Sequence, residues 1–418
     1  MPSNLTLELL DGLVGRTIRT GTLTLIGADG RRRLHGDGAP PIVAIRIDDP
    51  SLYAKILVNP ELAVGEAYMD GGLTIAEGDL RGFLQLFHQN AANLRSRPIR
   101  RALAGAVRRL KRFQQFNPIG KAEQNVAHHY DISNAFYRLF LDEDLHYSCA
   151  YFEHDGQSLE DAQQAKLRHI AAKLRIEPGM RVLDIGSGWG GLAMYLAKTF
   201  RAEVVGLTLS REQRDLAAAR AAERGLAGSV DFRLLDYREA TEKFDRIVSV
   251  GMFEHVGVPH YPEFFGKIDA LLAADGLALI HTIGRKGPPG VTGPWIRKYI
   301  FPGGYSPSLS ETMAAIEPTG LWVSDVEVLR LHYADTLREW SRRFAENRDA
   351  VRTMFDERFC RMWEFYLATA EFSFRSSGHV NFQIQLAKSQ ASAPIRRDYM
   401  QQTEAALRMG AFGGVAKE

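Results

Sequence analysis

The stretch Val182-Leu183-Asp184-Ile185-Gly186-Ser187-Gly188-Trp189-Gly190-Gly191 decides the fold. Residues 181–185 form a short apolar run that predicts a buried strand, and the glycines after it predict a tight turn into a helix beginning near Leu192. Glycine suits such a turn because its backbone bends freely and lets a ligand lie against it. Asp184 at the strand end, followed by the glycine turn, favours a nucleoside ligand with a methionine tail. A dinucleotide-binding fold has a similar pattern, so this stretch alone leaves both interpretations open.

Four more strands are expected downstream, and they separate the two interpretations. They are predicted at residues 203–208, 230–235, 246–250 and 276–281, with helical segments between them. Strands that alternate with helices indicate βαβ units and a parallel sheet that binds ligands at its strand ends. The spacing of the glycine turn, Thr208 and Asp236 resembles class I S-adenosylmethionine-dependent methyltransferases. This resemblance implies an α/β fold, with a Rossmann-like sheet covered by helices on both faces.

Length and composition limit the class of protein. The chain has 418 residues, enough for two domains. Its 45% hydrophobic and 24% charged residues are ordinary for a globular protein, and a formal net charge of +2 demands no anionic partner. There is no signal-like N-terminus and no stretch of about 20 apolar residues, which predicts a cytoplasmic protein. Cys149 and Cys360, the only cysteines, indicate neither a disulfide framework nor a metal site.

The order of segments predicts four parts. Residues 1–90 are expected to form a smaller α+β domain, residues 91–120 a basic amphipathic linker helix, residues 121–390 the catalytic domain and residues 391–418 a tail. Within the catalytic domain, residues 336–390 are rich in aromatic side chains and are expected to be helical.

The basic linker carries eight cations and no acidic residue between the first and the last. An amphipathic helix of this kind suits an anionic membrane surface, where each cation adds roughly 1 kcal/mol to binding. A solvated interdomain linker is the simpler alternative. Nucleic-acid binding is not expected, because no aromatic platform or known module accompanies the charges. The cations are Arg95, Arg97, Arg100, Arg101, Arg108, Arg109, Lys111 and Arg112.

Four motifs in the order of the chain carry a close resemblance to a known family. They are Tyr147-Ser148-Cys149-Ala150-Tyr151-Phe152, Gly251-Met252-Phe253-Glu254-His255-Val256-Gly257, His281-Thr282-Ile283-Gly284 and Lys298-Tyr299-Ile300-Phe301-Pro302-Gly303. These motifs resemble those of the cyclopropane-fatty-acyl-phospholipid synthases, kin to the mycolic acid cyclopropane synthases. The resemblance extends from about residue 40 to residue 390.

The resemblance implies S-adenosylmethionine as donor, an unsaturated phospholipid acyl chain as acceptor, bicarbonate as bound base and a lipid-binding N-terminal domain. Peripheral attachment to an anionic membrane is expected from the basic linker, and a homodimer is left open. The residues that match the family's catalytic positions are Cys149, Glu254, His281 and Tyr333. Those expected to bind the donor are Tyr147, Ser148, Asp184, Gly186, Gly188, Thr208, Gln213, Asp236 and Tyr237. Tyr237-Arg238 stands where the mycolate members have Trp-Glu, which puts the adenine contacts in doubt.

The reaction itself makes demands on the site. An alkene is a weak nucleophile, so the donor methyl must be aligned with the double bond in a dry pocket. Methyl transfer leaves a carbocation, and a base is needed only afterwards, when the ring closes. A lipid C-methyltransferase that gives methyl-branched or methylidene chains shares the first step and remains the alternative. A lipid-binding protein without activity is a third interpretation, disfavoured by the intact Glu254, His281 and Tyr333.

Overall fold

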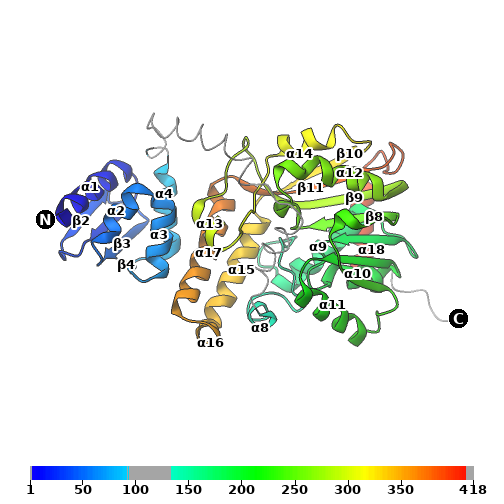
Figure 1. The fold of residues 1–418 in the computed structure, drawn as a ribbon, viewed down its shortest axis with the longest axis horizontal. Helices are drawn as coiled ribbons and strands as arrows, with labels where there is room; N and C mark the ends of the chain where they lie inside the picture. The colour runs from blue at the N-terminus through cyan, green and yellow to red at the C-terminus, as the bar shows by residue number, and fades with distance from the viewer. Residues whose placement is uncertain (1, 92, 94–132, 411–418) are drawn as a thin grey trace. The chain divides into compact units, whose positions relative to one another are not determined.

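The computed structural model describes residues 2–91, 93 and 133–410, which fall into two compact units. The described residues of the first unit are 2–91, 93, 291–302 and 340–378, and those of the second are 133–290, 303–339 and 379–410. Figure 1 traces the chain. Among the described helices, none combines the length and apolar character needed to span a bilayer.

The second unit is built on a seven-stranded sheet with the order β10-β11-β9-β8-β5-β6-β7. The strands β5 to β9 run parallel to one another, β11 runs antiparallel to β9, and β10 runs antiparallel to β11. The five strands expected from the sequence correspond to β5 to β9, so the predicted α/β fold is confirmed. The bounds are β5 Arg181–Ile185, β6 Glu203–Thr208, β7 Val230–Leu234, β8 Phe244–Val250, β9 Leu272–Arg285, β10 Trp322–Leu329 and β11 His379–Ala387.

Helices cover both faces of this sheet, as predicted, and Figure 1 shows α10 and α11 on the side opposite α12 and α14. One face packs on α9, α10 and α11 through residues such as Ile170, Leu196 and Ala217, and the other packs on α12 and α14 through Phe264 and Ile316. The helices are α8 Asn134–Tyr137, α9 Leu159–Leu174, α10 Gly191–Phe200, α11 Arg211–Glu223, α12 Tyr261–Leu271, α14 Leu309–Ile316, α15 His332–Glu346 and α18 Asp398–Arg408, with 3-10 turns at Tyr237–Glu239, Phe253–His255 and Val258–His260.

The prediction that residues 336–390 are wholly helical is wrong at its C-terminal end. Residues 379–387 form β11, which pairs along its length with β9. Its side chains alternate between polar and apolar: Asn381, Gln383 and Gln385 point to one face of the sheet, whereas Phe382 and Ile384 point to the other. Both sets are buried. The strand therefore keeps a two-residue alternation of polar and apolar side chains although neither face is exposed to water.

The first unit contains a four-stranded sheet with the order β2-β1-β3-β4. The strands β1 and β3 run parallel, while β1 pairs with β2 and β3 with β4 in antiparallel fashion. Apolar residues of the sheet and its helices form one core that includes Leu10, Leu25, Ile45 and Phe83. The elements are α1 Pro2–Thr17, β1 Thr22–Ile26, β2 Arg32–Gly36, β3 Ile42–Ile47, α2 Ser51–Val58, α3 Pro60–Met69, β4 Leu73–Glu77 and α4 Leu80–Gln89.

Two later segments of the chain pack within this first unit, which differs from the division drawn from the sequence. They carry α13 (Pro294–Tyr299), α16 (Arg348–Met354) and α17 (Glu357–Ser376). Lys298 of α13 pairs with Glu66 of α3 at 2.6 Å, and Arg81 of α4 pairs with Glu371 of α17 at 3.0 Å. The predicted basic linker helix lies outside the described residues, apart from residues 91 and 93.

Candidate active site

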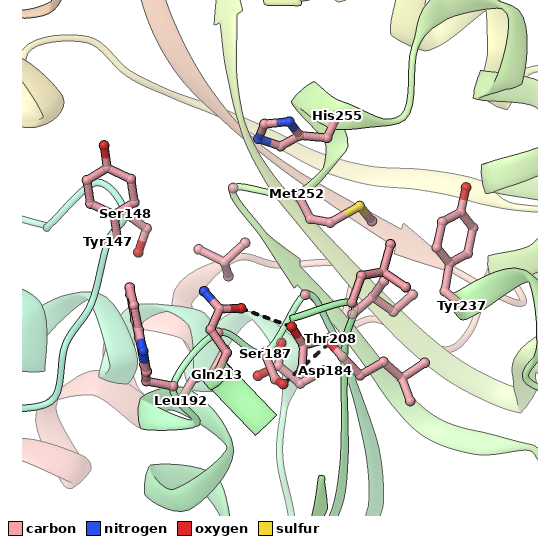
Figure 2. Close-up of a pocket in the computed structure, with 18 of the residues that line it drawn as sticks. Tyr147, Ser148, Asp184, Ser187, Leu192, Thr208, Gln213, Tyr237, Met252 and His255 are labelled. Carbon is pink, nitrogen blue, oxygen red and sulfur yellow. Dashed lines mark hydrogen bonds between the residues drawn. The ribbon is translucent and has the colours of Figure 1, made fainter. Parts of the chain in front are cut away.

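A pocket lies at the carboxyl ends of β5, β6 and β8, where an open parallel sheet binds its ligands. Figure 2 shows side chains converging on it from the glycine turn, from β6 and from the loops after β7 and β8. The structure brings together in its wall all nine residues expected to bind the donor. They are Tyr147, Ser148, Asp184, Gly186, Gly188, Thr208, Gln213, Asp236 and Tyr237.

The glycine turn after β5 presents backbone to this pocket. Gly186 and Gly188 have φ values of 85° and 55°, in the left-handed region that favours glycine. The amides of Gly186 and Ser187 both donate to the carbonyl oxygen of Leu207 at 2.9 Å, which fixes the turn against β6. A Cβ at Gly188 would meet no protein atom within 4 Å, so the space in front of it belongs to the pocket.

The end of β6 offers neutral hydrogen-bonding groups. The hydroxyl of Thr208 donates to Oε1 of Gln213 at 2.9 Å and accepts from the amide of Ser210 at 3.1 Å. Ser210 caps α11, since its side chain accepts from the amide of Gln213. This arrangement holds Gln213 over the strand end, in the place where many nucleoside-binding folds use a carboxylate.

At the end of β7, Asp236 lines the pocket and pairs with Arg238. Asp236 is buried, and its carboxylate accepts from Nε and Nη2 of Arg238 at 2.9 and 2.6 Å. Both carboxylate oxygens of Asp236 therefore accept from Arg238. Tyr237 lies at the opposite side of Figure 2 from Tyr147, with its ring edge-on to Phe264 at 5.3 Å.

The segment Tyr147–Phe152 is held between two helices. Gln163 and Lys166 of α9 donate to the carbonyl oxygen and the hydroxyl of Ser148, both at 3.1 Å. From α15, Thr336 accepts from the amide of Ala150 at 3.0 Å, and His332 Nδ1 accepts from the amide of Phe152 at 3.0 Å. The position of this segment therefore depends on α9 and α15 together.

Burial shifts the ionisation of several groups that line the pocket. It raises the pKa of Asp184 to about 7, lowers that of Lys166 to about 8 and lowers that of His255 to about 4. Lys166, His255 and His146 were missed by the sequence reasoning. Of these three, only His255 could have been found from the sequence, because it belongs to one of the four family motifs. No local sequence pattern indicates that a lysine on a helix lines the pocket.

None of the four predicted catalytic residues lines this pocket, although all four are buried. Glu254 follows β8 between the lining residues Met252 and His255. Its Oε1 accepts from the amide of Ile283 at 2.6 Å, while its buried Oε2 has no hydrogen-bond partner among the described residues. Burial raises the pKa of Glu254 to about 7. The carboxyl is thus fixed at one oxygen, while the other is buried without a hydrogen-bond partner among the described residues.

His281 lies in β9, two residues before Ile283, whose amide donates to Glu254. Its carbonyl oxygen accepts from the amide of Gly251 at 2.9 Å. Its ring nitrogens Nδ1 and Nε2 are hydrogen-bonded to the side-chain amides of Gln383 and Asn381 at 3.1 and 3.3 Å. Burial lowers its pKa to about 3, so the imidazole is neutral at physiological pH.

The remaining two residues are Cys149 and Tyr333. The thiol of Cys149 donates to the carbonyl oxygen of Ala150 at 3.3 Å, and burial raises its pKa well above the ordinary value. It is therefore a neutral thiol and not a nucleophile. Tyr333 is buried in the first turn of α15, three residues before Thr336, which holds Ala150. No group of three or more His, Cys, Asp or Glu side chains in the described ranges is arranged to hold a metal ion.

Comparisons with known proteins agree with this architecture. The family model described as mycolic acid cyclopropane synthetase matches residues 119–384, and a domain of unknown function matches residues 18–97. The chain is 39% identical over 334 residues to the cyclopropane-fatty-acyl-phospholipid synthase of Escherichia coli strain K12, covering 79% of this chain and 84% of that protein. It is 37% identical over 363 residues to a probable fatty acid methyltransferase of Pseudomonas putida, covering 84% and 88%.

Among solved structures, the mycolic acid cyclopropane synthase CmaA1 complexed with SAH and CTAB matches with a TM-score of 0.61 at 35% identity, covering 65% of this chain and 99% of that one. The match to the family model spans more than half of the chain, and the E. coli relative aligns over most of its own length. The chain therefore belongs to the mycolic acid cyclopropane synthetase family of S-adenosylmethionine-dependent methyltransferases.

Proposed function

We propose that the protein transfers a methylene group from S-adenosylmethionine to the double bond of an unsaturated phospholipid acyl chain and forms a cyclopropane ring. The name of the E. coli relative supports this acceptor and this product. The observation that carries the proposal is the carboxyl of Glu254. It is buried next to the donor pocket, and its Oε2 has no partner among the described residues.

The chemistry explains why such a carboxyl is needed. The donor, when bound, supplies an electrophilic methyl group on a sulfonium. The chain's own residues must hold that methyl against the double bond, which is a weak nucleophile, and must exclude water. A pocket at buried strand ends suits both tasks. A proton leaves only as the ring closes, so its acceptor must lie beside the reacting carbons and must not itself attack the cation.

Bicarbonate is the proposed base, and when bound it supplies an oxygen that takes up this proton. The unpartnered Oε2 of Glu254 fits the group, because it would accept a hydrogen bond from the bicarbonate hydroxyl. Tyr333 is proposed as a donor to the same anion. His281 fits poorly as a donor to this anion, since both of its ring nitrogens are already bonded to Gln383 and Asn381. Its proposed role is to provide an uncharged side chain, held in one orientation, beside the proposed site of the anion.

The alternative is a lipid C-methyltransferase with the same first step, favoured by the name of the P. putida relative. The lipids of a host expressing the protein separate the two. Mass spectrometry detects the added methylene in both cases, whereas proton NMR detects the strongly upfield hydrogens of a cyclopropane ring. We expect those signals with the wild-type protein and not with Glu254→Gln. An added methylene without ring hydrogens would establish the alternative.

A further inference from the structure

One buried cation in the wall of the donor pocket has no role in the proposed reaction. Lys166 on α9 is 2% exposed, and its Nζ donates to the hydroxyl of Ser148 at 3.1 Å. In the described part of the chain, no carboxylate lies within ion-pair distance of this ammonium. Both Lys166 and Ser148 line the pocket. The ammonium is therefore buried with one neutral partner.

A buried ammonium is costly unless an anion compensates it, and the neighbouring acids do so only at longer range. Asp142 and Asp144 attract the ammonium without pairing with it. Asp142 is hydrogen-bonded to the amide and Nδ1 of His146 at 2.8 and 2.7 Å, and Asp144 pairs with Arg220 and Arg224. Asp184 is itself buried, and its pKa is raised to about 7, so it is only partly ionised at neutral pH. The pocket that Lys166 lines is the place from which a further anion can approach this ammonium at contact distance.

The position of Lys166 in the pocket indicates which part of a ligand it would meet. In Figure 2, Tyr147 and Ser148 lie at one end, Tyr237 lies at the other, and Thr208 stands between them. A donor whose ribose lies at Thr208 and whose adenine lies toward Tyr237 extends its amino-acid tail toward Ser148. The carboxylate of that tail is the only anionic group of the donor.

We infer that Lys166 binds the carboxylate of the donor's methionine tail and that Ser148 holds the ammonium in place for this contact. The inference rests on the proposed function, because it takes S-adenosylmethionine as the ligand. A competing anion would be the bicarbonate proposed near Glu254. The geometry favours the carboxylate, since Lys166 and its partner Ser148 line the donor pocket whereas none of the four predicted catalytic residues does.

Calorimetry with two probes tests the inference: S-adenosylhomocysteine and its analogue without the carboxylate. A hydrogen bond to a charged group is worth about ten- to a hundredfold in affinity. We expect the wild-type protein to prefer S-adenosylhomocysteine by about that factor. Lys166→Met and Lys166→Gln should weaken its binding and bring the preference close to one. Lys173→Met, which removes another buried lysine of the same helix, should leave the preference unchanged.

Each result is decisive. Wild-type protein that binds both probes equally overturns the inference without any variant, even if the Lys166 variants fail to fold. A folded Lys166→Met protein that keeps the full preference, or that loses affinity for both probes equally, also overturns it. A wild-type protein that binds neither probe contradicts the proposed function itself, and that failure is distinct from the other two. Loss of the preference in folded Lys166 variants alone supports the assignment.

Discussion

At the scale of single residues, the ionisation of Glu254 controls the proposed reaction. Its Oε2 accepts a hydrogen bond only in the carboxylate form, and burial raises the pKa to about 7. Turnover should therefore fall as the pH drops through about 7 and rise above it. Glu254→Gln should lower turnover by about 10²-fold, the usual scale of a lost acid–base group, with donor affinity nearly unchanged.

Pre-steady-state assays from pH 5.5 to 9 on donor-saturated protein measure this profile. Glu371→Gln, which changes a buried glutamate of α17 outside the pocket, serves as the matched control and should keep the wild-type profile. Full turnover of Glu254→Gln would remove this residue from the mechanism, and a profile that stays flat through pH 7 would contradict its ionisation.

The glycine turn gives a second prediction at this scale. Gly188 has a φ of 55°, and the space in front of its Cα is open pocket, so a side chain there would fill the volume of the ligand. Gly188→Val should abolish measurable binding of S-adenosylhomocysteine and cost about 1–3 kcal/mol of backbone strain. Gly225→Val is the control, because Gly225 also has a positive φ and open space but lies outside the pocket. Unchanged affinity in Gly188→Val, measured by calorimetry, would place the donor elsewhere.

Much of the pocket could be predicted because its residues sit at strand ends or inside motifs. Thr208 and Asp236 follow predicted strands, and the sheet topology brings strand ends together. The partners of those residues could not be predicted. Arg238 neutralises Asp236 through a local contact, whereas Asn381 and Gln383 reach His281 from a strand about 100 positions away. Lys166 lines the pocket because α9 packs beside it, and no local sequence pattern predicts that packing.

At the scale of elements, His169 joins three parts of the second unit. Its Nε2 and Nδ1 bond to Glu327 of β10 and Glu404 of α18, both at 2.7 Å, and its ring stacks on Tyr151 at 4.2 Å. Although burial lowers its pKa, the two carboxylates raise it more, so the net direction is upward despite the neighbouring Lys173. The charged His169 side chain therefore links α18 to strand β10 through its two carboxylate partners.

The stability that this contact contributes depends on pH. A raised pKa in the folded state stabilises the protein below the unfolded value of about 6.5, and the contribution is lost as the pH rises through the folded pKa. Glu404→Gln should therefore destabilise the second unit by about 1–3 kcal/mol at pH 6 and by clearly less at pH 9. Chemical unfolding at the two pH values measures the difference. An equal loss at both pH values would contradict the expected titration of His169 between them.

Strand β11 differs from the helix that the sequence predicts over residues 336–390. The alternation Asn381-Phe382-Gln383-Ile384-Gln385 has the two-residue period of a strand, but the aromatic residues before it favoured a continuous helix. The polar side chains of β11 are buried because they meet partners: Gln385 bonds to the hydroxyl of Tyr399 at 2.8 Å. In a sequence, alternating polar residues predict a face exposed to water. That these side chains are buried can be recognised only when their hydrogen-bond partners are known.

At the scale of the whole molecule, the two units are not continuous in sequence. The order of segments predicted a separate N-terminal domain, but it could not show that residues 291–302 and 340–378 complete the first unit. The contacts responsible, such as Lys298 with Glu66, join positions more than two hundred residues apart. Such pairs leave no trace in composition or periodicity.

Membrane attachment is a prediction for the whole protein. The cations between Arg95 and Arg112 lie outside the described residues, so the argument rests on their charge alone. Each cation near an anionic surface contributes about 1 kcal/mol, and salt screens it beyond about 8–10 Å. Replacing Arg108, Arg109 and Arg112 with Gln should weaken binding to anionic vesicles in a cosedimentation assay and spare activity on detergent-dispersed lipid. Untouched vesicle binding would favour the solvated linker.

The central claim is that the transferred methyl group loses a proton and becomes part of a ring. Purified protein, given donor with a fully deuterated methyl group, unsaturated phospholipid and bicarbonate, tests this directly. We predict a product in which deuterium NMR places the label on a cyclopropane carbon and mass spectrometry shows the loss of one deuteron. Turnover should fall when bicarbonate is removed and recover when it is restored. A product that keeps the intact deuterated methyl group on an open chain would contradict the proposed function.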